Sequence, residues 1–136
     1  MSFLFGLTVV TALIHEMGHA MAWALLGANV REVGYARPYR RALRMTIGEL
    51  TIAFSPFTIF AYTLIEDSGE RSRHFSRFQK ILVHGAGIGA NLLTAVFAAL
   101  FGGPAGHLFA VFSASLAVQN VFFRDGKRIL SALSGS

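Results

Sequence analysis

The chain has 136 residues, of which 54% are hydrophobic and 14% are charged, and its formal net charge is +5. Soluble domains are about 25% charged, and a soluble domain of this size cannot hide so much apolar surface, so the composition favours a membrane protein. The absence of cysteine excludes a disulfide framework and leaves only histidine and carboxylate side chains as metal ligands.

The first predicted element is an apolar helix over about residues 3–27, which is long enough to span a bilayer. The ionisable side chains within its apolar run are His15, Glu16 and His19. Because positions i and i+4 share one helix face, both histidines can point at one metal ion, and Glu16 can reach a water beside it. This is the H-E-x-x-H zinc pattern, in which the glutamate acts as general base.

Such a cluster is costly at bilayer depth, at about 2.5–3.5 kcal/mol for each ionisable group. A structural zinc site in small peptides contributes about 10–16 kcal/mol, which is enough to offset that cost. The alternative interpretation is that all three side chains are neutral and hydrogen-bonded inside a helix bundle.

The segment 30–80 holds nine of the twelve Lys and Arg residues. Alternating apolar and polar residues predict a β-hairpin with strands 43–47 and 50–54, and the pattern also allows an extra strand near 31–35. Ser55-Pro56 either breaks the second strand or puts it at a sheet edge.

The rest of that segment leads to the next helix. Residues 57–65 are apolar but too short to span, so we expect them in the membrane interface or dipping into the bundle. An acidic loop over 66–70 follows. The basic run 71–80 favours a membrane-surface anchor over a nucleic-acid patch.

Two more spanning helices are predicted over about residues 81–101 and 107–123, and a short tail follows. Gly85 and Gly89 have the spacing that lets another helix approach closely. Asn91 lies at lipid depth and needs a partner, either for packing alone or at a functional site.

Three spans would place every Lys and Arg residue on one side of the membrane. By the positive-inside rule that side is cytoplasmic and the N-terminus is outside. The same asymmetry explains the net charge, so we expect a lipid bilayer and no nucleic acid as partner.

A catalytic zinc ion takes three protein ligands, so the two histidines need a third. The candidates are His74, His84, His107, Asp67, Asp125 and the other glutamates. His107 falls on the opposite side of the membrane, whereas His84 and Asp125 lie near the end where His19 could meet them. Asp125 is favoured because the following Gly126 permits a backbone break that turns the carboxylate inward.

Three motifs of the chain resemble, in the same order along the sequence, those of the site-2 protease (M50) family of intramembrane zinc metalloproteases. HEMGH at 15–19 matches the family's H-E-x-G-H, and AGIGANLL at 86–93 is similar to its A-G-P-x-A-N-L-L. Asn120 with Asp125-Gly126 resembles its N…D-G motif. The predicted hairpin and the basic run before the second helix also fit.

The resemblance implies a mainly α membrane protein, with three transmembrane helices and a small β-hairpin or sheet between the first and second. It implies that His15, His19 and Asp125 bind one zinc ion and that Glu16 activates water. Asn91 and Asn120 would hold the substrate backbone or the oxyanion. The function would be an endopeptidase that cuts transmembrane segments of other proteins, in a bacterial or archaeal plasma membrane.

The motifs also depart from the family pattern. Ile88 replaces the proline of the second motif, Val121 replaces the proline after Asn120, and the spacing from Asn120 to Asp125 is short. No PDZ-like insertion is present, so residues 1–136 would form a single near-minimal core or a fragment of a longer protein.

We expect a polar cavity that opens to the cytoplasmic side, and a substrate unwound and held by β-addition to the hairpin 43–54. The rival hypothesis is a non-catalytic, zinc-stabilised scaffold or an inactive protease homologue. A metal transporter is less favoured, because the outer halves of the helices carry almost no polar residues.

Overall fold

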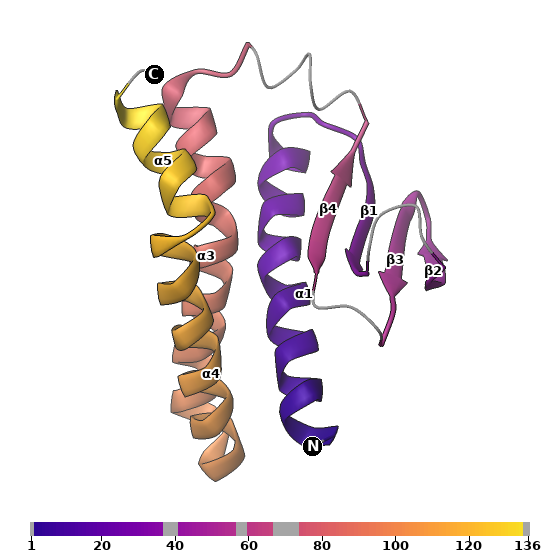
Figure 1. The fold of residues 1–136 in the computed structure, drawn as a ribbon, viewed down its shortest axis with the longest axis vertical. Coiled ribbons are helices and arrows are strands. Elements are labelled where there is room, and N and C mark those ends of the chain that lie inside the picture. Colours follow the sequence, from indigo (N-terminus) through magenta and orange to yellow (C-terminus); the bar gives the residue numbers. More distant parts are fainter. Residues whose placement is uncertain (1, 37–40, 57–59, 67–73, 135–136) are drawn as a thin grey trace.

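Helix α1 (Ser2–Leu25) stands between a helical bundle and a small sheet (Figure 1). The structure is a computed structural model that describes residues 2–36, 41–56, 60–66 and 74–134. The bundle consists of α3 (Arg77–Phe101), α4 (Gly103–Phe122) and α5 (Asp125–Ser134). The sheet contains β1 (Val30–Tyr35), β2 (Leu43–Ile47), β3 (Leu50–Phe54) and β4 (Ala61–Ile65).

The helices α1, α3 and α4 are long and apolar enough to cross a membrane, which confirms the three predicted spans. Helix α3 begins four residues earlier than expected because Ser76 caps it. The Ser76 hydroxyl accepts a hydrogen bond from the Gln79 backbone N–H, and the Gln79 side chain accepts one from the Ser76 N–H. Helix α4 also begins four residues earlier than expected, with Pro104 in its first turn, so residues 103–106 belong to the helix.

The sheet has the strand order β2-β3-β1-β4. The predicted hairpin is confirmed, with β2 and β3 antiparallel around Gly48, whose φ of +62° suits a tight turn. The additional strand β1 is also present and pairs parallel with β3. Strand β3 therefore lies inside the sheet, and Ser55-Pro56 ends this strand without placing it at an edge.

Strand β4 is the part of the sheet that sequence reasoning missed. Residues 61–65 were expected at the membrane interface or in the bundle, but they pair antiparallel with β1 at the edge of the sheet. Tertiary pairing with β1 decides this conformation, because a five-residue apolar segment carries no distinct period of its own. Residues 57–59 and most of the expected acidic loop lie outside the described residues.

The sheet packs along the length of α1. Val33 and Tyr35 of β1 are 1% and 2% exposed, and the Tyr35 ring meets that of Phe5 near the start of α1, with centroids 6.2 Å apart. Near the middle of α1, Thr63 of β4 contacts Glu16. The strands thus run beside a membrane span rather than beyond its end.

Glycines set the distance between α1 and α3, but not the two expected from the sequence. A Cβ on Gly18 would lie 2.5 Å from the Ala86 carbonyl oxygen, so this glycine allows the close approach. Among described residues, no atom lies within 4 Å of a Cβ built on Gly85 or Gly89. The expectation that these two glycines mediate close packing is wrong here, because they lie off the face of α3 that carries buried Val83, Gly87, Asn91 and Ala95.

Candidate metal centre

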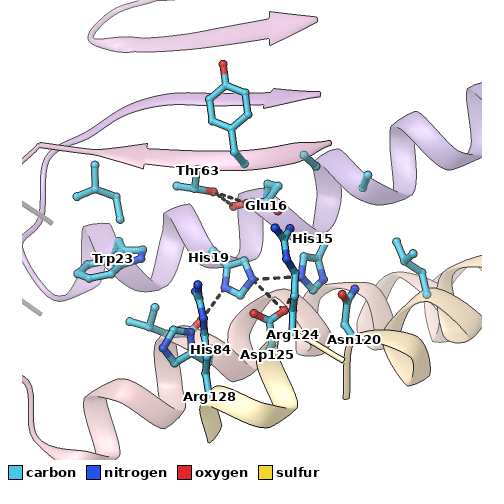
Figure 2. A pocket seen from close by; sticks show the side chains of 16 residues that line it. His15, Glu16, His19, Trp23, Thr63, His84, Asn120, Arg124, Asp125 and Arg128 are labelled. Carbon is cyan, nitrogen blue, oxygen red and sulfur yellow. Dashed lines mark hydrogen bonds and ion pairs between the residues drawn. The ribbon is translucent and has the colours of Figure 1, made fainter. Parts of the chain in front are cut away.

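Three donor side chains converge at one buried point between α1 and the start of α5. The Asp125 Oδ2 atom lies 2.9 Å from His15 Nε2 and 3.4 Å from His19 Nε2, and the two Nε2 atoms are 3.1 Å apart (Figure 2). All three residues are buried, and one ligand atom from each lies within 4.8 Å of the others. The structure therefore brings together the three residues that were predicted as ligands.

The remaining nitrogen of His19 is held by the neighbouring helix. His19 Nδ1 lies 2.7 Å from the carbonyl oxygen of Val83, to which its N–H donates. This tautomer leaves the Nε2 lone pair facing the other two donors, and such backbone anchoring is typical of metal-binding histidines.

His15 has a comparable partner in Asn91. Asn91 Nδ2 is 3.4 Å from His15 Nδ1, and Asn91 Oδ1 is buried with no hydrogen-bond partner among the described residues. Rotating the amide by half a turn would let Oδ1 accept from the Nδ1–H of His15 and leave His15 Nε2 free for a metal ion. The orphaned oxygen thus fits a metal-bound state of His15.

Gly87 makes room for the donor atoms. A Cβ at this position would lie 2.6 Å from His19 Nε2 and 2.8 Å from His15 Nε2, closer than real contacts allow. Gly126 has a related role, because a Cβ there would lie 1.6 Å from the Val121 carbonyl oxygen. The absence of a side chain at Gly126 lets α5 begin directly after α4, which brings Asp125 to the histidines.

The donor set suits zinc, which takes imidazole nitrogen and carboxylate oxygen as ligands. Burial raises the pKa of Asp125, but its interactions with His15 and His19 outweigh this effect and hold the pKa below its usual range. Asp125 is therefore a carboxylate at neutral pH, which is the form that binds a metal.

A cavity of about 410 Å³ opens beside the donor atoms. Glu16 lies in its wall, and Thr63 of β4 holds that side chain. The Thr63 Oγ1 atom lies 2.9 Å from both the Oε2 atom and the backbone oxygen of Glu16, and its hydroxyl can donate to either (Figure 2). Sequence reasoning missed Thr63 because β4 itself was not expected.

The two asparagines predicted at the site occupy different places. Asn120 of α4 lines the cavity, whereas Asn91 is fully buried behind His15. Their predicted roles at the substrate stay predictions.

His84 lines the cavity without joining the donor cluster, and His74 and His107 are exposed. Two further cavity residues, Arg124 and Arg128, were not singled out from the sequence.

The sequence as a whole matches one known protein family. The family described as Peptidase family M50 matches residues 2–134, which is nearly the whole chain and includes every residue of the donor cluster. No curated protein matches the sequence. The family match confirms the resemblance that the three motifs indicated.

Proposed function

The chain belongs to peptidase family M50, a family of intramembrane zinc metalloproteases, and we propose that it hydrolyses peptide bonds in or beside the transmembrane segments of other proteins. Its three apolar helices make it an integral membrane protein. The observation that carries the proposal is the convergence of His15, His19 and Asp125 on one buried point, with Glu16 in the adjoining cavity wall.

In this proposal His15, His19 and Asp125 hold one zinc ion. Zinc, when bound, supplies Lewis acidity for activating water and polarising the scissile carbonyl. Glu16 takes the proton of the attacking water and later delivers it to the leaving amine. The Thr63 hydroxyl holds Oε2 of Glu16, so that Oε1 can accept the proton.

Strand β4 is the best candidate for holding an unwound substrate. Substrate binding by β-addition requires an edge strand, and β3 of the hairpin has neighbours on both sides. Strand β2 is an edge strand but does not line the cavity, whereas Ala61, Tyr62, Thr63 and Ile65 of β4 do. We therefore assign the substrate clamp to β4 in place of the hairpin, with Asn120 facing the same space.

The proposed topology follows the positive-inside rule, with the N-terminus outside and the basic segment in the cytoplasm of a bacterium or archaeon. Arg124 and Arg128 lie at the cavity, so the cavity opens near the basic ends of the helices. Water and substrate would then enter from the cytoplasmic side.

The experiment that tests the function is cleavage of a single-span membrane protein in reconstituted vesicles. Wild type is compared with Glu16→Gln and with wild type after chelation, and zinc is counted per chain in each sample. We expect cleavage only by the zinc-loaded wild type, and about one zinc ion bound by Glu16→Gln. Bound zinc without cleavage of any substrate would instead support a zinc-stabilised scaffold or an inactive homologue.

A further inference from the structure

Two arginines share the cavity with the metal centre. Arg124 lies between α4 and α5, and Arg128 lies one turn later on α5. Both line the cavity, and in Figure 2 Arg124 extends toward Glu16 while Arg128 lies beside His84. Both residues are exposed, so their guanidinium groups are accessible from the cavity mouth.

Among the described residues, these two arginines have no acidic partner of the kind that Arg31 and Arg44 of the sheet have. Arg31 pairs with Glu66, and Arg44 pairs with Glu32 at 3.2 Å. Within the described part of the chain, no ion pair or side-chain hydrogen bond involves Arg124 or Arg128. Asp125, the carboxylate next to them, is instead held by the two histidines.

The charge balance of the cavity favours an anion. The formally charged residues among its described lining are Arg124, Arg128, Glu16 and Asp125, so their two positive and two negative charges cancel. A divalent metal ion raises the sum to +2. A cleft with one sign of excess charge and low-dielectric walls concentrates ligands of the opposite sign.

We propose that Arg124 and Arg128 form a carboxylate-binding subsite, which selects substrates with an Asp or Glu side chain beside the scissile bond. This proposal rests on the proposed protease function and names its substrate class. Guanidinium groups bind carboxylates through paired, charge-assisted hydrogen bonds. A peptide extended along β4 would direct alternate side chains into the cavity that these arginines line.

Lipid phosphate is the other anion near a membrane surface, and the structure favours the peptide carboxylate. Both arginines line the space that holds Glu16 and the metal ligands, where a scissile bond must lie. An arginine that served headgroups alone would have no reason to line this space.

The test measures binding separately from turnover. The full chain carrying Glu16→Gln is loaded with zinc in uncharged detergent and titrated with fluorescent peptides. The peptides differ only by Glu or Gln at one position, which is scanned along the peptide. We expect the Glu peptide to bind about tenfold more tightly at one position, as charge-assisted hydrogen bonds predict. Arg124→Gln and Arg128→Gln should bring this ratio toward one.

Lys127→Gln is the matched control, because it removes the same charge from α5 at a residue that does not line the cavity. It should keep the wild-type ratio. Arg128→Glu provides a second variant, which should prefer a Lys peptide over a Glu peptide. Zinc content verifies that each variant retains the metal centre.

Equal binding of Glu and Gln peptides at every position would overturn the proposal, as would a preference that survives both arginine changes. Arginine-dependent binding to vesicles of anionic lipid, without any peptide preference, would assign the arginines to headgroups and also overturn it. If peptide selection depends on the arginines but wild type cleaves nothing, the subsite stands and the protease function fails.

Discussion

Substitution of Gly87 by alanine tests the metal centre most directly. The added methyl group would lie 2.6 Å from His19 Nε2 and 2.8 Å from His15 Nε2. Ordinary contacts begin near 3.5 Å, so the rings must retreat by about 0.9 Å and 0.7 Å respectively. Zinc–ligand distances tolerate only about 0.2 Å of deviation, so both histidines would leave coordination range.

The same change should have little effect on folding. Overpacking of a buried site costs about 1–3 kcal/mol. Alanine favours a helix over glycine by about 1 kcal/mol, which offsets part of that cost. We therefore expect Gly87→Ala to fold, to bind zinc at least about 100-fold more weakly than wild type, and to lose cleavage as a result. A loss of about 100-fold is the upper end of what changes to residues beside metal ligands cause.

The assay is zinc stoichiometry after dialysis against a competing chelator, together with thermal unfolding of the metal-free protein. Gly85→Ala and Gly89→Ala are matched controls on the same helix, since neither added methyl group would meet a described atom within 4 Å. Both controls should retain zinc. Wild-type zinc affinity in Gly87→Ala would refute the proposed position of the donor cluster.

Three further predictions concern residues around the cluster. Thr63→Val removes the hydrogen bond to Glu16 and should lower kcat about 10–100-fold at unchanged zinc content, whereas Thr63→Ser should restore it; equal loss in both variants would contradict a positioning role. Asn91→Leu should weaken zinc binding about 10–100-fold in a chelator competition, because His15 loses its partner, and unchanged affinity would exclude that role. Gly126→Ala should lower the unfolding temperature and abolish zinc binding, because its Cβ would collide with a backbone oxygen; a stable, zinc-loaded variant would show that the α4–α5 junction differs from this structure.

Strong local signals explain what was predicted correctly. Three long apolar stretches favoured membrane helices, and the alternation of apolar and polar residues on both sides of Gly48 favoured a hairpin; the structure has both. The i, i+4 spacing of His15 and His19 places both on one helix face in any helical context. The three motifs likewise indicated the family that the full sequence matches.

Pairing and packing between distant segments escaped prediction. Strand β4 exists because β1 pairs with it. Helix α5 occupies the segment that was expected to be only a short tail. Gly85 and Gly89 have the expected spacing, but the rotation of α3 directs Gly87 at the histidines instead. The contact between Thr63 and Glu16 joins residues 47 positions apart, and no local period encodes it.

The amino-acid sequence by itself determined the membrane environment, the spans and the chemistry of the donor residues, because these follow from composition and short-range spacing. Asp125 was already favoured from the sequence as the third donor, but only the tertiary structure brought its carboxylate to the two histidines. Only the tertiary structure decided which strand borders the cavity and which arginine side chains line it. These features depend on how α1, α3 and α5 pack at close range, through Gly18, Gly87 and Gly126. Long-range packing of this kind is settled by the shapes of surfaces that meet only in the folded chain.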